Sequence, residues 1–129
     1  MRRKLLIADD SEMNRAILAN VLDQEFEVIE ATNGQEVIIA LQSYGTQISA
    51  LLLDIVMPEM DGFEVLEEMN RRHWIEDIPT IMISAETSNT YIDRAFELGA
   101  SDYISRPFVP GIVRRRIINT ILLHTKKHQ

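Results

Sequence analysis

The stretch ALLLDIVMPEMDG, residues 50–62, constrains the fold of this chain more than any other. An uninterrupted apolar run, 50–53, ends at the carboxylate of Asp54, and Pro58 and Gly62 then break the chain. Short apolar runs of this kind are typical of strands that are buried on both faces of a parallel sheet. Open α/β sheets bind ligands just beyond the carboxyl ends of such strands. Asp54 is therefore predicted to lie in a ligand-binding crevice, and the alternative is a solvated aspartate in a loop.

Four further stretches have the character of short strands. They lie at 4–8, 25–30, 79–84 and 101–105, and the second alternates less cleanly, which favours a place near the sheet edge. Amphipathic helical patterns fill the intervals. Strands that alternate with helices predict a parallel sheet with helices on both faces. We predict an α/β fold of the doubly wound, flavodoxin-like type, with five parallel strands in the order 2-1-3-4-5 flanked by five helices.

Capping residues mark where the helices begin and end. Ser11, Asn33 and Asp61 are suited to helix N-caps, and Gly45 and Gly99 are suited to end helices. The last helix is predicted to begin near Pro110 and to run to about Leu123. Its apolar stripe is wider than one packed face needs; core burial explains most of it, and the rest indicates a dimer surface or a continuing helix. The apolar residues expected on one face of the other helices are Met13, Ile17, Leu18, Val21 and Leu22; Val37, Ile38 and Leu41; Val65, Leu66 and Met69; and Tyr91, Ile92, Ala95 and Phe96.

The composition limits the class of function. A length of 129 residues predicts one domain over 1–129, either a complete small protein or the N-terminal module of a longer regulator. Thirteen basic and 20 acidic residues give a net charge of −7, which argues against direct nucleic-acid binding. Arg114–Arg116 is expected to be a solvated face or to supply salt-bridge partners for a neighbouring subunit. No apolar stretch approaches the ~20 residues of a membrane span, and the absence of cysteine excludes thiolate metal sites. We expect a cytoplasmic protein.

Polar residues stand at the ends of the central strands. Asp9 and Asp10 follow the first strand, Asp54 the third, Ser84 ends the fourth, and Arg106 follows the fifth. Because parallel strands all point the same way, these groups should meet at one edge of the sheet. Three carboxylates that lie close together need a cation in order to stay ionised, and oxygen ligands favour Mg²⁺. The sequence therefore predicts a magnesium site.

A carboxylate beside Mg²⁺, a hydroxyl and a basic side chain fits phosphoryl transfer best. An aspartate can act as the nucleophile and form an aspartyl phosphate. The metal ion and a basic side chain would neutralise the charge on the transferring group. Asp54 is the predicted nucleophile because it lies on the central strand, and the Val56 carbonyl could complete the metal shell.

The segments that identify a family are Asp9-Asp10, Asp54 within LLLDIVMPEMDG, Ser84-Ala85-Glu86, and Tyr103-Ile104-Ser105-Arg106-Pro107-Phe108. Over essentially its whole length the chain resembles the receiver domain of two-component response regulators. The resemblance implies that Asp54 accepts a phosphoryl group from a histidine kinase or a phosphotransfer protein. It also implies Mg²⁺, with Mn²⁺ as a substitute, held by Asp10, Asp54 and the Val56 carbonyl, while Asp9 acts mainly through water.

The resemblance also implies a switch. Ser84 would bond a phosphoryl oxygen and draw its loop inward, and Tyr103 would change rotamer to fill the vacated space. Val56, Ala85 and Glu86 would be modulating positions. The chain would be a signalling domain with intrinsic phosphotransfer and autodephosphorylation chemistry, and not a metabolic enzyme.

The surface expected to respond consists of the helix that ends at Gly99, the strand at 101–105 and the helix after Pro110. Through this surface the receiver would control an output domain or partner protein. A homodimer formed through the same surface is the alternative. Receivers that end in Arg-Pro-Phe and continue with a basic helix such as VRRRI, as here, resemble regulators whose outputs are cyclic-dinucleotide enzymes.

One position departs from the family pattern. The family usually has lysine where this chain has Arg106, and a guanidinium is a longer, planar fork that does not replace an ammonium group. We expect its charge role to survive with altered geometry and rate, and the Arg106–Pro107 bond to be cis. In the alternative, Arg106 turns to a surface acid and the chain is a degenerate receiver that binds partners independently of phosphate.

Two enzyme classes compete with this interpretation. A small Mg²⁺-dependent phosphatase or phosphotransferase with an aspartate nucleophile would need a second acid two residues further on, where this chain has Val56. A flavodoxin-like FMN protein would need a phosphate-binding loop rich in Ser, Thr and Gly after the first strand, where this chain has Asp9 and Asp10. This chain lacks the feature that each of the two classes requires.

Overall fold

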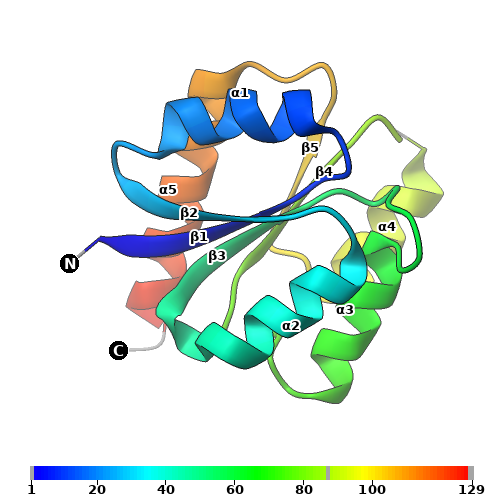
Figure 1. Ribbon diagram of the computed structural model, residues 1–129. Helices are drawn as coiled ribbons and strands as arrows, with labels where there is room; N and C mark the ends of the chain where they lie inside the picture. The colour runs from blue at the N-terminus through cyan, green and yellow to red at the C-terminus, as the bar shows by residue number, and fades with distance from the viewer. Residues whose placement is uncertain (1, 87, 128–129) are drawn as a thin grey trace.

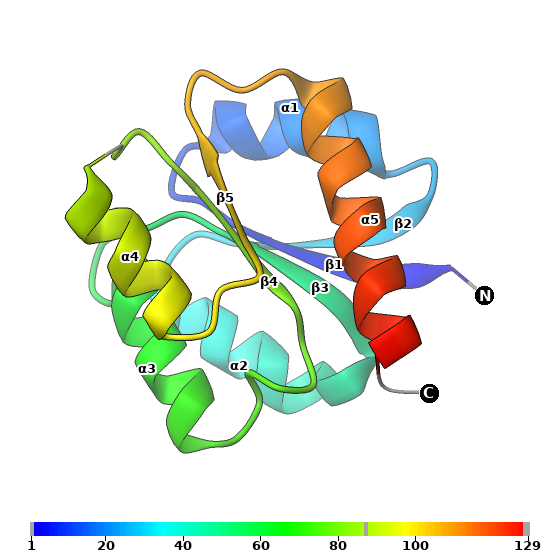
Figure 2. The same cartoon turned by 180° about the vertical axis from the view of Figure 1, so that it is seen from behind.

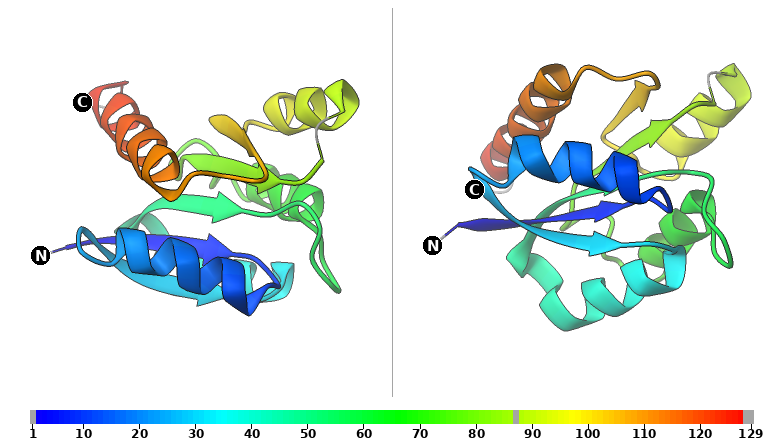
Figure 3. Two further views of the ribbon diagram at one scale, coloured as in Figure 1. Left: turned by 90° about the horizontal axis from the view of Figure 1, so that it is seen from above. Right: turned by 45° about the horizontal axis from the view of Figure 1, so that its top comes forward.

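The sheet of the protein consists of five parallel strands (Figure 1). A computed structural model describes residues 2–86 and 88–127. Within that range the strands lie in the order β2-β1-β3-β4-β5, so the predicted doubly wound topology is confirmed. In the right-hand view of Figure 3 the strand arrows point toward the same edge of the sheet, as a parallel sheet requires. The strands are β1 (Arg3–Ala8), β2 (Phe26–Ala31), β3 (Ile48–Leu53), β4 (Thr80–Ser84) and β5 (Asp102–Ser105).

Five α-helices and one short 3₁₀ helix connect the strands. They are α1 (Glu12–Leu22), α2 (Gly34–Tyr44), η1 (Gly45–Gln47), α3 (Gly62–Arg71), α4 (Asn89–Glu97) and α5 (Pro110–Lys127). The side chains of Ser11, Asn33 and Asp61 accept hydrogen bonds from the first turns of α1, α2 and α3, as their sequence contexts predict. Helix α5 continues past Leu123, the predicted end, because no glycine or proline stops it there.

The helices cover both faces of the sheet. Helices α1 and α5 lie on one face, and α2, α3 and α4 lie on the other (Figure 2). Each face has its own apolar core. The largest fully buried side chains are Leu5, Leu6, Ile7, Leu18, Leu22, Leu41, Ile48, Leu51, Leu52, Leu53, Leu66 and Met69. Because β3 is buried on both sides, the chain beyond it is held rigidly, which positions Asp54.

Two helices bury less of their apolar face than the sequence indicates. In α1 only Leu18 and Leu22 are buried, whereas Met13 is 72% exposed. In α4 only Ala95 is buried, and Tyr91 packs against Phe63 of α3 with ring centroids 5.5 Å apart. The apolar residues that the sequence places on one face of these helices are therefore only partly buried, because the sheet and the neighbouring helices cover only part of that face. No described helix is both long and apolar enough to cross a membrane.

Candidate functional site

The predicted site residues meet at the carboxyl edge of the sheet. Asp9 directly follows β1, Asp54 follows β3, Ser84 ends β4, and Arg106 follows β5. Backbone hydrogen bonds continue past the strand ends, since the Asp54 amide donates to the Ala8 carbonyl at 3.0 Å and the Arg106 amide to the Ser84 carbonyl at 2.9 Å. The sheet therefore fixes the backbone from which each of these side chains extends.

Three carboxylates form an acidic cluster at this edge. Asp9, Asp10 and Asp54 each contribute an oxygen, and these oxygens all lie within 4.8 Å of one another. Asp9 is fully buried and Asp54 is 3% exposed, whereas Asp10 faces solvent. A set of oxygen donors with an open, solvated side fits a hard divalent cation that keeps some of its water.

The guanidinium group of Arg106 lies across the acidic cluster. Its Nη2 donates to Asp9 Oδ2, and its Nη1 donates to Asp54 Oδ2 at 3.3 Å. The Arg106 side chain is 19% exposed, and its Nε is buried without a hydrogen-bond partner among the described residues. The alternative in which Arg106 pairs with a surface acid is therefore wrong.

Asp9 is held by further contacts that the sequence did not indicate. Its Oδ1 accepts a hydrogen bond from the Ser11 amide at 2.8 Å, and the hydroxyl of Ser11 in turn caps α1. Arg15 of α1 donates to the Asp9 backbone carbonyl at 2.7 Å. Asp9 thus has a hydrogen-bond donor on each carboxylate oxygen and a fixed orientation.

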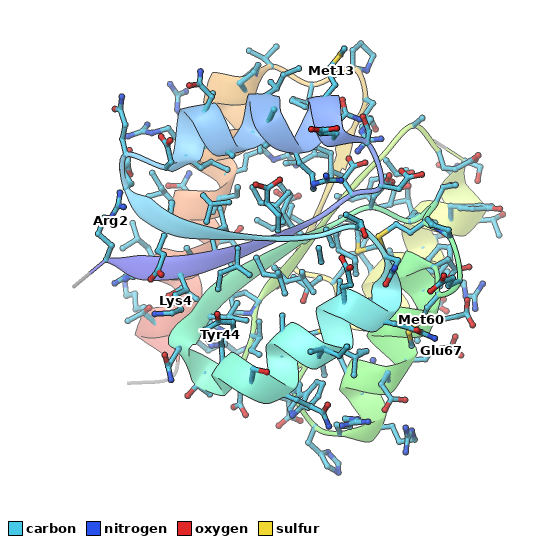
Figure 4. All side chains as sticks on the ribbon, in the orientation of Figure 1. Arg2, Lys4, Met13, Tyr44, Met60 and Glu67 are labelled. Carbon is cyan, nitrogen blue, oxygen red and sulfur yellow. The ribbon has the colours of Figure 1, made fainter. Side chains whose placement is uncertain are left out.

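Two glycines support the loop that carries Asp54 into α3. The Gly62 amide donates to the Ile55 carbonyl at 2.8 Å, and the Gly34 amide donates to the Met60 carbonyl at 3.1 Å. A Cβ atom at Gly62 would lie 2.4 Å from the Asp54 carbonyl oxygen. Sequence reasoning assigned neither glycine a role in the site, although each directly follows a helix N-cap residue. Met60, labelled in Figure 4, lies beside the start of α2.

The environment of Asp54 disfavours its charge without abolishing it. Burial is the main cause that raises the pKa of Asp54 to about 6; the Arg106 guanidinium opposes this shift, and the Asp9 carboxylate adds to it. The backbone amides of Ile55 and Val56 hydrogen-bond to the carboxylate and also lower its pKa. At neutral pH the Asp54 side chain is therefore mostly ionised, as a nucleophile must be.

The backbone N–H and C=O of Glu86 connect Ser84 with Tyr103. Ser84 Oγ accepts a hydrogen bond from the Glu86 amide at 3.1 Å, and the Tyr103 hydroxyl donates to the Glu86 carbonyl at 2.7 Å. Ser84 is buried, and Tyr103 is 8% exposed, so that burial raises the pKa of the Tyr103 phenol. A displacement of Glu86 would consequently reach both side chains.

A largely apolar groove opens beside the acidic cluster. Its volume is about 610 Å³, and its lining comes from α1, from the segment after β4, from the segment between β5 and α5 and from the first residue of α5. The residues that line it are Asn14, Ile17, Ala85, Arg106, Pro107, Phe108 and Pro110. The Arg106–Pro107 peptide bond is cis. At the start of α1, Met13 points away from the sheet (Figure 4).

Comparison with known proteins gives a consistent result. Residues 5–118 match the family described as response regulator receiver domain. The chain is 40% identical over 114 residues to the response regulator RR06 of Streptococcus pneumoniae, an alignment that covers 88% of this chain and 50% of that protein. It is 39% identical over 119 residues to the transcriptional regulatory protein SrrA of Staphylococcus aureus, covering 91% of this chain and 47% of that protein. The chain thus spans about half the length of these curated relatives.

Solved structures share the fold. A CheY-like response regulator receiver domain protein from Methanospirillum hungatei superposes with a TM-score of 0.89 at 23% identity, covering 98% of this chain and 99% of that one. A structure described as a probable two-component system response regulator/GGDEF domain protein superposes with a TM-score of 0.86 at 26% identity. That alignment covers 95% of this chain and 50% of the other.

Proposed function

Because the chain belongs to the response regulator receiver domains, we propose that Asp54 accepts a phosphoryl group from a histidine kinase or a phosphotransfer protein. A receiver domain is a signalling domain and not a metabolic enzyme. The observation that carries the proposal is the convergence of three carboxylates, one of them at the end of the central buried strand, with a guanidinium group beside them.

The phosphotransfer step needs an ionised, fixed nucleophile. A carboxylate oxygen of Asp54 forms the new bond to phosphorus while the P–N bond of the donor phosphohistidine breaks. The electron pair of that bond stays on the imidazole nitrogen of the donor. Burial holds the Asp54 pKa near 6, which leaves the carboxylate mostly ionised and weakly solvated at neutral pH. Arg106 and Ser84 border the same edge and would donate hydrogen bonds to phosphoryl oxygens.

A divalent cation fits the acidic cluster. Asp10, Asp54 and the Val56 carbonyl would hold Mg²⁺ or Mn²⁺, with Asp9 acting mainly through water. When bound, the cation supplies neutralising charge for the phosphoryl oxygens. Asp10 suits this role because its carboxylate faces solvent, where a cation that keeps part of its hydration shell can approach.

The switch would act through Glu86. If Ser84 turns so that its Oγ moves to a phosphoryl oxygen, the hydrogen bond that Oγ accepts from the Glu86 amide would be lost, and the carbonyl of the same residue is bonded to Tyr103. The change would pass to the surface of α4, β5 and α5, where the Arg116–Asp102 ion pair joins the last two elements. Val56, Ala85 and Glu86 would modulate the reaction.

The output would be a further domain or a partner protein. A cyclic-dinucleotide enzyme is one such output, supported by the likeness to a response regulator/GGDEF domain protein. A homodimer through α4, β5 and α5 is the competing use of that surface. Its exposed apolar residues include Phe96 on α4, 46% exposed, and Ile112 on α5, 49% exposed.

Intact mass tests the phosphoacceptor directly. After incubation with acetyl phosphate and Mg²⁺, the wild-type protein is expected to gain one phosphoryl group, because a small donor needs only the nucleophile and its charge partners. Asp54→Ala should gain none, and a chelator should prevent the gain in wild type. If no phosphoryl group adds and beryllofluoride also fails to bind, the chain acts independently of phosphate and the proposal is wrong.

We propose that a protein donor rests on the groove beside the acidic cluster, which Arg106 borders. The donor for this test is a purified histidine kinase that phosphorylates the wild-type protein. Ile17→Asp, in the groove, should lower the rate of transfer from this kinase by about tenfold, because it removes one apolar contact at the interface. Its rate with acetyl phosphate should not change. Ile39→Asp, an exposed isoleucine on α2, is the matched control. Equal slowing with both donors would show damage to the site and contradict this docking surface.

A further inference from the structure

Arg106 holds two carboxylates at once, which a lysine at the same position would do less well. Its two terminal nitrogens each donate to a different partner, Asp9 Oδ2 and Asp54 Oδ2. A guanidinium group offers several donors in a fixed plane, whereas an ammonium group is a compact point charge. The two terminal nitrogens of Arg106 therefore bind two of the three carboxylates that could hold a cation, Asp9 and Asp54.

Both carboxylate oxygens of Asp9 accept a hydrogen bond in this arrangement. The Ser11 amide donates to its Oδ1 and Arg106 donates to its Oδ2. The Asp9 side chain is 1% exposed and that of Asp54 is 5% exposed, so water contributes little to either carboxylate. A cation that approaches Asp9 or Asp54 must therefore displace or share a charge-assisted hydrogen bond, and such bonds are strong.

We propose that Arg106 is a built-in counter-cation that competes with the divalent cation for Asp9 and Asp54 in the unphosphorylated protein. Arginine stays protonated at all physiological pH values, so it cannot leave the site by losing its charge. The competition makes the resting protein a weak binder of divalent cations.

Phosphorylation of Asp54 would end the competition. Arg106 Nε is buried and has no hydrogen-bond partner in the described chain, so the side chain has an unused donor. A phosphoryl group brings several acceptor oxygens, and a guanidinium binds such groups through two parallel hydrogen bonds. As Arg106 turns to them, Asp9 becomes free for the cation. This part of the inference rests on the proposed phosphorylation of Asp54, whereas competition in the resting protein does not.

Mn²⁺ binding to the unphosphorylated protein, measured by electron paramagnetic resonance, tests the competition without any activity readout. Arg106→Lys keeps the positive charge but loses the two guanidinium nitrogens that bind Asp9 and Asp54 together. The variant is therefore expected to bind Mn²⁺ about tenfold more tightly than wild type. Arg116→Lys is the matched control, because Arg116 pairs with Asp102 away from the cluster. It should bind Mn²⁺ as wild type does. Equal affinities in Arg106→Lys and wild type, or no binding in either, would overturn the competition.

A second readout follows the arginine itself. The ¹⁵N resonance of Arg106 Nε, assigned by its absence in Arg106→Lys, is expected to shift when Mg²⁺ is added, and an unmoved resonance would also overturn the competition. With beryllofluoride bound at Asp54, the difference in Mn²⁺ affinity between the two proteins should fall to within about twofold. A tenfold difference that persists would overturn the release step alone. Failure of beryllofluoride to bind would instead count against Asp54 as the phosphoacceptor.

Discussion

Between pH 4 and pH 7 the cation-free wild-type protein is expected to lose up to about 3 kcal/mol of stability relative to Asp54→Asn. The pKa of Asp54 is raised in the folded protein, chiefly by burial, from an ordinary value of 3.8 to about 6. Over this pH range the folded state binds more protons than the unfolded state, so the free energy of unfolding falls as the pH rises. The stability is fully present well below pH 3.8, where both states are protonated, and it is lost as the pH rises through 6.

Urea unfolding across this pH range, with a chelator present, measures the difference. Asparagine has no charge to bury, so Asp54→Asn should lack the loss, while the titrating groups away from the acidic cluster contribute equally to both proteins. Asp93→Asn, on the exposed side of α4, is the matched control and should follow wild type. Mg²⁺ should narrow the difference at pH 7, because a cation stabilises the ionised carboxylate. A difference that is constant with pH would contradict this prediction.

The edge of the sheet that carries the site was predictable because it depends on chain direction alone. Asp54 follows an uninterrupted apolar run, and Asp9 and Ser84 stand in the same relation to their own strands. Once the sheet is known to be parallel, these residues must share one edge. The convergence therefore needs no knowledge of side-chain packing, and the structure brings the three carboxylates together at this edge.

The division of roles within the site was not predictable in this way. Asp9 and Asp10 are adjacent in sequence, yet only Asp9 is buried, because successive residues of an extended chain point in opposite directions and the starting phase is a matter of tertiary structure. Arg106 has a long side chain that could reach several acids. Its choice of Asp9 together with Asp54 depends on distances that only the folded chain sets.

The exposed halves of α1 and α4 show another limit. A helical stripe such as Met13 with Ile17 shows which face is apolar, but it does not show how far the neighbouring elements extend over that face. In this protein Ile17 lines the groove with Phe108 instead of entering the core. Surfaces left open in this way are candidates for contact with other proteins.

Gly62→Ala is expected to destabilise the protein by about 3 kcal/mol and to weaken Mn²⁺ binding at the acidic cluster. The added Cβ atom would lie 2.4 Å from the Asp54 carbonyl oxygen and 2.8 Å from the Ile55 Cα, and both of these neighbours are backbone atoms that cannot rotate away. The loop would have to move, and with it the residue that begins it, Asp54. Urea unfolding and Mn²⁺ titration of the same variant measure the two effects.

Gly111→Ala is the matched control, because the same atom added in the first turn of α5 would meet nothing within 4 Å. Alanine forms helices better than glycine, so this control should be as stable as wild type or up to about 1 kcal/mol more stable. The two variants carry the same chemical change, and they differ only in whether backbone occupies the space. If the free energy of unfolding of Gly62→Ala lies within about 1 kcal/mol of that of wild type, the loop can move to accommodate the Cβ atom without destabilising the protein. The fixed orientation of Asp54 then does not depend on close packing at this glycine.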